Sequence, residues 1–144
     1  MEENILEEAP QFKLYKDFAV RVGTFFGGPL VAGYLIAENF KNLGEKNKIK
    51  MTWIITIIAT ILIFVIAYFV STSTSFPSYI LPLVYTGIAS ALVQQMQGPR
   101  IKSHEADGGQ FYSAWRALLV GAIGLAITIG ALFLLFIALD LRVP

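Results

Sequence analysis

A short polar stretch, RIKSHEADGG, holds the residues from which a catalytic or metal site could be assembled. Its His104, the only histidine in the chain, is followed by Glu105 and Asp107, and imidazole and carboxylate groups are common ligands of divalent metals. The spacing matches no metal-binding motif, and nothing in the sequence brings His104 to Ser103 or Ser113 as the base of a nucleophile–base pair. We therefore expect a solvated loop here, with no metal site and no catalytic residue.

The rest of the chain carries no catalytic motif. It has no Walker-type phosphate-binding loop, no Gly-x-Ser-x-Gly turn and no His-Glu-x-x-His sequence. Because cysteine is absent, disulfides, thiolate metal sites and thiol nucleophiles are excluded. The net charge of +1 indicates no nucleic-acid partner. We expect a protein that is not an enzyme and that uses no cofactor.

Gly27, Gly28 and Pro29 interrupt an otherwise apolar segment. In transporters, broken helices expose backbone groups that coordinate an ion or a ligand. A kink, or close packing against another helix, explains the same residues and is the interpretation we favour. Gly23 and Gly27 are also spaced as Gly-x-x-x-Gly, which lets membrane helices approach closely. Small residues recur at this spacing in four further places: Gly33 with Ala37, Gly87 with Ala91, Ala117 with Gly121, and Ala122 with Ala126 and Gly130.

Three polar residues belong to this first apolar segment. Arg21 lies one helical turn after Asp17, so it can form an ion pair with it or extend toward the lipid headgroups. Glu38 and Asn39 end the segment beside a lysine-rich loop. An ionisable group inside a membrane is by default a candidate for function, but this position favours an ordinary interfacial role.

A later apolar segment ends in three glutamines, Gln94, Gln95 and Gln97. At this spacing their amide groups occupy two faces of a helix. They could line a polar vestibule or form hydrogen bonds between helices, and we favour hydrogen bonds between helices.

The composition predicts that the elements carrying these residues lie in a membrane. Hydrophobic residues make up 56% of the 144 residues and charged residues 15%, whereas a soluble domain has about 25% charged residues. The charges gather in residues 2–21, 38–50 and 100–116. Between these patches the sequence is apolar, as expected for segments that cross lipid.

Three apolar segments read as membrane-spanning helices. Residues 51–70 and 117–139 are uncharged and long enough to cross a hydrocarbon core of about 30 Å. Residues 79–97 form a third segment, which Gly98 and Pro99 end.

The first segment, residues 18–37, follows an acidic tail of residues 1–17 and contains both Arg21 and the glycine–proline break. It is either one kinked spanning helix or an interfacial helix followed by a re-entrant one. We favour the spanning helix. The predicted fold is therefore all-α: a single-domain (1–144) integral membrane helical bundle of about four transmembrane helices, the first broken at Gly27–Pro29.

Basic residues predict the orientation, because lysine and arginine in short loops prefer the cytoplasm. Both basic loops, residues 41–50 and 100–116, should be cytoplasmic, with STSTSFPS and the C-terminus outside. If the first segment were re-entrant, Lys13, Lys16 and Arg21 would join the cytoplasmic side, which raises its basic residues from seven to ten. That count favours the re-entrant alternative.

The stretch LYKDFAVRVGTFFGGPLVAGYLIAENFKNLGEK resembles a block found near the N-terminus of a family of uncharacterised bacterial integral membrane proteins, with the pattern FxGGPLxAGYLxxxNFxxLG. The glutamines, Gly108, Gly109, Ser113 and Trp115 resemble later features of that family. The resemblance implies a multi-pass protein of the bacterial inner (cytoplasmic) membrane, and it implies no activity.

Three roles fit these observations. The favoured one is a non-catalytic structural or accessory subunit that acts through helix–helix packing in the lipid bilayer, as a homo-oligomer or with a partner membrane protein. The second is a small oligomeric transporter or channel-type protein, which the broken helix and the glutamines support. A lipid-active enzyme using His104, Glu105 and Asp107 ranks third.

Overall fold

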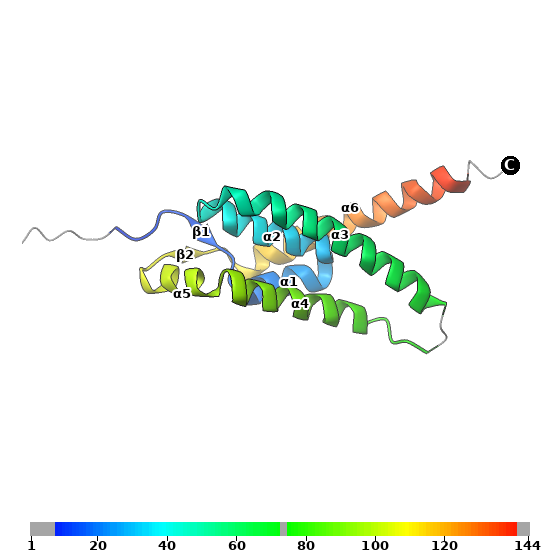
Figure 1. Ribbon diagram of the computed structural model, residues 1–144, viewed down its shortest axis with the longest axis horizontal. Helices are drawn as coiled ribbons and strands as arrows, with labels where there is room; N and C mark the ends of the chain where they lie inside the picture. Colours follow the sequence, from blue (N-terminus) through cyan, green and yellow to red (C-terminus); the bar gives the residue numbers. More distant parts are fainter. Residues whose placement is uncertain (1–7, 73–74, 141–144) are drawn as a thin grey trace, which may run out of the picture.

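The computed structural model describes residues 8–72 and 75–140, which form six helices and a short two-stranded parallel ribbon (Figure 1). In chain order the elements are β1 (Lys13–Leu14), α1 (Asp17–Gly27), α2 (Pro29–Asn42), α3 (Lys46–Ser71), α4 (Ile80–Met96), α5 (Gly98–Ala106), β2 (Gln110–Phe111) and α6 (Ala114–Asp140). The all-α prediction is confirmed. Two helices, α3 and α6, are long and apolar enough to cross a membrane, and α4 is a shorter apolar helix.

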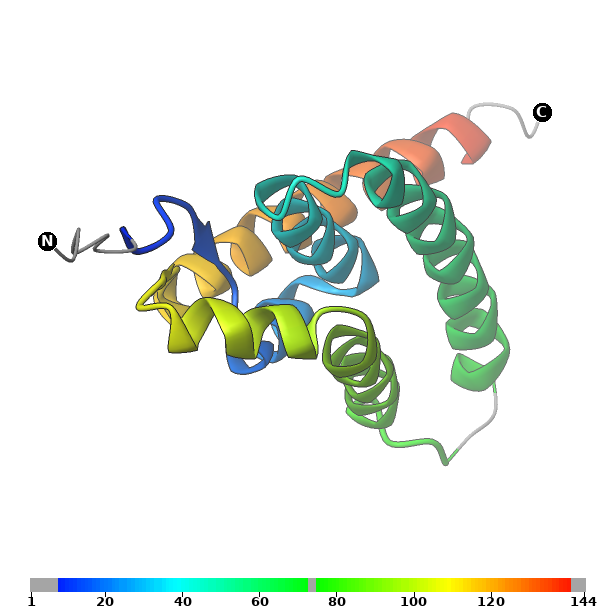
Figure 2. The ribbon, with the colours of Figure 1, turned by 60° about the vertical axis from the view of Figure 1, so that its left-hand side comes forward.

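The broken segment folds as a helical hairpin. Gly28 adopts φ 83° and ψ −176°, a region of backbone space that is essentially restricted to glycine. Its N–H donates to the Thr24 carbonyl at 2.8 Å and closes α1, and Pro29 begins α2, where its missing N–H costs nothing. The chain therefore reverses here, and α2 returns beside α1 (Figure 2).

This hairpin replaces the single kinked helix expected for residues 18–37. Its two ends lie together, since the Tyr15 N–H before α1 donates to the Asn39 side chain near the end of α2 at 2.7 Å. The Asn42 amide also donates to the Lys13 carbonyl at 2.9 Å. The break expected at Gly27–Pro29 is present, but the single kinked helix was wrong, because Gly28 reverses the chain, which a proline kink alone does not.

Small residues bring the hairpin against its neighbours. Gly23 and Gly27 of α1 face Ala117 and Gly121 of α6, so that a Cβ added to Gly27 would lie 2.7 Å from the Gly121 Cα. Gly33 of α2 lies against Thr56 of α3 in the same way. The prediction that these spaced small residues serve packing is confirmed at these three contacts.

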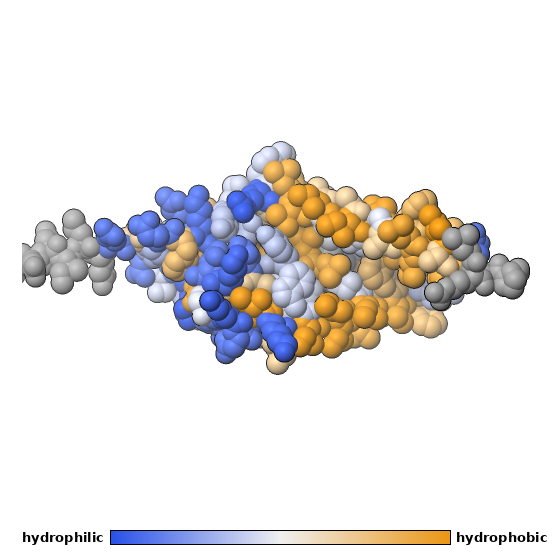
Figure 3. All heavy atoms as spheres, turned by 90° about the horizontal axis from the view of Figure 1, so that it is seen from above, coloured by the Kyte–Doolittle hydropathy of each residue, from blue (hydrophilic) through white to orange (hydrophobic). Residues whose placement is uncertain are grey.

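One end of the molecule is polar and the remainder is apolar (Figure 3). The polar end contains the parallel β1–β2 ribbon, which pairs Lys13 with Gln110 and Leu14 with Phe111, and it contains α5. The expected loop around His104 is instead helix α5, whose Ile101 and His104 are buried on one face. Gly98 and Pro99 do end α4, but they also begin this new helix.

Toward the apolar end, α6 diverges from α3 and α4 (Figures 1 and 2). The buried residues of α6 are Ala117 and Gly121, both in its first third. Large hydrophobic side chains beyond them are exposed, among them Phe133 at 63% and Phe136 at 68%. In water this surface would be unfavourable, whereas acyl chains or another protein would cover it.

Candidate functional site

A buried amide cluster fastens the open ends of the hairpin. Asn39 is fully buried. Its side chain accepts from the Tyr15 N–H and donates to the Tyr15 carbonyl at 2.9 Å, so it pairs with Tyr15 as a neighbouring strand would. It also donates to the Gln97 side-chain oxygen at 3.0 Å, and Gln97 donates to the Ile36 carbonyl at 2.9 Å. The cluster joins the start of α1, the end of α2 and the α4–α5 junction.

Tyr15 extends this cluster to α6. Its hydroxyl accepts a hydrogen bond from the Arg116 Nε at 3.1 Å, and its ring packs on Tyr112 with 4.6 Å between the centroids. Burial raises the pKa of Tyr15 above its ordinary value, although Arg116 acts in the opposite direction. The hydroxyl therefore stays protonated at neutral pH and holds the guanidinium in place as a neutral acceptor.

A second polar cluster joins α1 to α4. The Asp17 carboxylate accepts from the Ser90 hydroxyl at 2.7 Å and from the Gln94 amide at 3.3 Å. It also pairs with Arg21 at 3.1 Å, one turn along α1. Gln94 therefore forms a hydrogen bond between two helices. The positive charge of Arg21 is paired with Asp17, the partner that the sequence suggested.

The other two polar residues singled out from the sequence lie away from these clusters. Glu38 pairs with Lys41 at 3.7 Å on the same helix, as an interfacial residue would. Gln95 is exposed on α4. Sequence spacing thus marked the right region, but it did not separate the buried Gln97 from the exposed Gln95.

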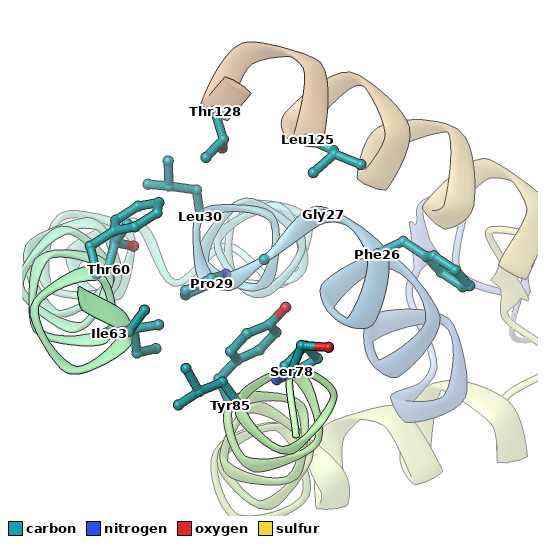
Figure 4. A pocket seen from close by; sticks show the side chains of 15 residues that line it. Phe26, Gly27, Pro29, Leu30, Thr60, Ile63, Ser78, Tyr85, Leu125 and Thr128 are labelled. Atoms are coloured by element: carbon teal, nitrogen blue, oxygen red, sulfur yellow. The ribbon is translucent and has the colours of Figure 1, made fainter. Parts of the chain in front are cut away.

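The hairpin tip borders a cavity of about 260 Å³ between α3, α4 and α6 (Figure 4). Helix α1 ends at this cavity and helix α2 begins at it. The negative end of one helix dipole and the positive end of the other therefore face the cavity. The Tyr85 hydroxyl points toward the break and donates to the Phe25 carbonyl at 3.3 Å. The cavity is otherwise lined mainly by apolar side chains, with hydroxyl groups from Thr60, Ser78 and Thr128.

These groups can bind, but they offer little for catalysis. The four hydroxyl groups could hold a small polar solute, whereas the Gly28 N–H and C=O are already bonded within the hairpin. Within residues 8–72 and 75–140, no three His, Asp or Glu side chains lie close enough together to hold a metal ion.

His104, which was expected in a solvated loop, is buried in the structure. Its ring stacks on Phe12 at 4.8 Å and meets the edge of Phe111 at 5.1 Å, while Nε2 lies 2.8 Å from the Gln110 carbonyl. A side chain at position 109 would overlap the His104 ring, so Gly109 makes room for it. The spacing of Ile101 and His104 on one helical face was the signal that could have indicated burial.

Comparison with known proteins gives no match that would explain these features. No protein-family model matches the chain, and no curated protein or solved structure matches it significantly. The resemblance to the uncharacterised bacterial membrane family stays a prediction.

Proposed function

We propose that this chain is a multi-pass protein of the bacterial inner membrane in which α3, α4 and α6 span the bilayer. The α1–α2 hairpin then enters the membrane from the cytoplasmic side and returns to the same side. The hydrogen bonds between Tyr15 and Asn39 support this, because they require both ends of the hairpin to lie at one membrane surface.

The charge distribution supports the same orientation. Ten of the eleven lysines and arginines lie within the described residues, and the other is Arg142. With a re-entrant hairpin all ten fall on one side, which the preference of basic residues for the cytoplasm makes the inner side. They are Lys13, Lys16, Arg21, Lys41, Lys46, Lys48, Lys50, Arg100, Lys102 and Arg116.

Within that membrane, the role that the geometry supports best is a non-catalytic subunit of a homo-oligomer. The observation that carries it is the open cavity beside Gly28. Non-helical backbone at membrane depth is tolerated only where protein or a watery cavity covers it. Gly124 is the last glycine of α6 that packs against the hairpin, and a Cβ added to Gly130 would meet nothing within 4 Å. A second copy of the chain is the simplest cover for this open side.

Cross-linking in native membranes tests this role. The chain has no cysteine, so Gly130→Cys introduces the only thiol, and we expect it to form a disulfide dimer on oxidation. Ile61→Cys, on an exposed face of α3, is the matched control and should cross-link much less. A monomer in nanodiscs at every protein-to-lipid ratio, together with equal cross-linking at both positions, would refute the oligomer.

A transport role is the second candidate, because the same cavity is lined by the broken hairpin and four hydroxyls. We expect liposomes containing the protein to pass a small ion or solute faster than empty liposomes do. Tyr85→Phe removes the hydroxyl that contacts the break, so it should change the flux and leave oligomer formation intact. Flux equal to that of empty liposomes for every ion tested would exclude this candidate.

A further inference from the structure

A second hollow lies on another side of the hairpin and shares Leu30 with the cavity at its tip. It is an apolar groove of about 390 Å³ between α2, α3 and α6. Tyr34 and Trp53 line its α2 and α3 sides, and Val120, Ile123 and Ile127 line its α6 side. An added Cβ on Gly124 would overlap the Val31 side chain, so glycine there lets α6 approach α2 and form the floor.

A fixed cation stands at the polar end of this groove. Arg116 lies on the same face of α6 as Val120, Ile123 and Ile127, because the spacings of 4, 7 and 11 residues return to one side of a helix. Its Nε is held by the Tyr15 hydroxyl, and its guanidinium carbon lies 4.4 Å from the centre of the Tyr112 ring. The side chain is exposed, and among the described residues none of the ion pairs involves it.

Further charges surround the same end. Lys50 is exposed one turn before Trp53 on α3, and Glu38 lies one turn after Tyr34 on α2, where it pairs with Lys41. Three cationic side chains thus stand against one carboxylate. A guanidinium presents donors that match phosphate oxygens, and basic pockets between membrane helices on the cytoplasmic side suit anionic headgroups.

We propose that this groove binds an anionic phospholipid of the cytoplasmic leaflet. One acyl chain lies along Val120, Ile123 and Ile127, and the phosphate is bound by Arg116 with Lys50 nearby. Trp53 sits at the level where amphipathic rings meet the headgroups. This site rests on the proposed membrane orientation, because the polar end of the groove must face the leaflet surface.

Quenching of Trp53 by brominated lipids tests the site in the full-length chain. Trp115→Phe leaves Trp53 as the only tryptophan of the two. The protein is placed in vesicles of phosphatidylglycerol and phosphatidylcholine, with bromine on the chains of one or the other. Each basic side chain near the surface contributes about 1 kcal/mol to anionic lipid binding, so we expect about fivefold stronger association of phosphatidylglycerol per cation engaged.

Two variants and one control assign the effect. Arg116→Gln and, separately, Lys50→Gln should each reduce the preference for phosphatidylglycerol, and Lys50→Gln does so without disturbing the Tyr15 contact. Arg100→Gln removes a cation at the same polar end that is already paired with Glu45 at 2.7 Å, so the preference should persist.

The possible failures are distinguishable. Equal quenching by the two lipids overturns the lipid site, as does loss of the preference on adding soluble glycerol phosphate, which would indicate a site for free phosphate. No quenching of Trp53 by either lipid means that α3 lies outside the bilayer, and it then overturns the membrane placement itself.

Discussion

At the scale of single residues, Asn39 does the most to hold the hairpin closed. Replacing it with alanine leaves the Tyr15 N–H, the Tyr15 carbonyl and the Gln97 oxygen without this partner. Each buried polar group that loses its hydrogen-bond partner costs about 1–3 kcal/mol. We therefore expect Asn39→Ala to lower the free energy of unfolding by at least about 2 kcal/mol. Titration with SDS in mixed micelles, followed by circular dichroism, measures it.

Asn42→Ala is the matched control for that change. Asn42 makes one exposed hydrogen bond to the Lys13 carbonyl, so its loss should cost well under half as much. Equal losses for the two variants would mean that the buried cluster does not hold the ends of the hairpin together.

Sequence reasoning could mark polar residues in apolar segments, but it could not pair them. Asn39 and Gln97 stood out because amides are rare in such segments. Tyr15, the partner of Asn39, did not, since the contact is made by its backbone and spans 24 residues. Arg21 was the easier case, because its partner Asp17 lies four residues away on one helix.

Gly28 supports a second prediction at this scale. Its φ of 83° suits glycine, yet an added Cβ would meet nothing within 4 Å. Gly28→Ala should therefore destabilise through the backbone alone, by about 1–3 kcal/mol. Gly87→Ala also enters open space, but in a helix interior, so it should be neutral or slightly stabilising. Thermal unfolding in detergent compares the two variants. Equal midpoint temperatures would contradict the backbone strain expected for Gly28→Ala.

At the scale of elements, the seam between α1 and α6 decides how the hairpin docks. A Cβ on Gly121 would lie 2.8 Å from the Gly23 carbonyl oxygen, and that backbone cannot move aside without shifting α1. We expect Gly121→Leu to cost more than about 2 kcal/mol, as overpacked contacts do. SDS titration of the purified protein measures the change.

Gly130→Leu, two to three turns further along α6, enters space that is open within one chain. It should leave the stability of the monomer unchanged. If the chain forms the proposed oligomer, the same variant weakens association, which size analysis in nanodiscs detects. A loss of monomer stability as large as that of Gly121→Leu would contradict the assigned packing.

The long apolar helices could be predicted from the sequence, whereas α5 and the path from α1 to α2 could not. Long uncharged runs identify α3 and α6, and the residues expected to span as 79–97 correspond to α4. The glycine–proline break is compatible with a kink or a reversal, and the sequence does not give the backbone angles that Gly28 adopts, φ 83° and ψ −176°. The distribution of basic residues was the signal that pointed to the reversal.

At the scale of the whole molecule, the chain is arranged along one axis from a polar end to an apolar one (Figure 3). The polar end is held by ion pairs such as Arg100–Glu45 at 2.7 Å and by the β1–β2 ribbon. The apolar end has few internal contacts, because α6 leaves the others there. In the proposed membrane placement, acyl chains cover this apolar end, so the stability of the protein should depend on bilayer thickness.

The arrangement of the termini and loops gives the decisive prediction at this scale. With a re-entrant hairpin, residues before α1 and residues of α5 lie on the same side of the membrane, and the α3–α4 connection lies on the other. The absence of cysteine permits single replacements at exposed positions: Ala9→Cys, Ser103→Cys and Ser75→Cys. In intact cells an impermeant maleimide should label Ser75→Cys, while Ala9→Cys and Ser103→Cys react only after the membrane is permeabilised. If Ala9→Cys were labelled together with Ser75→Cys, the first segment would cross the bilayer, and the Tyr15–Asn39 contact could not exist in the membrane.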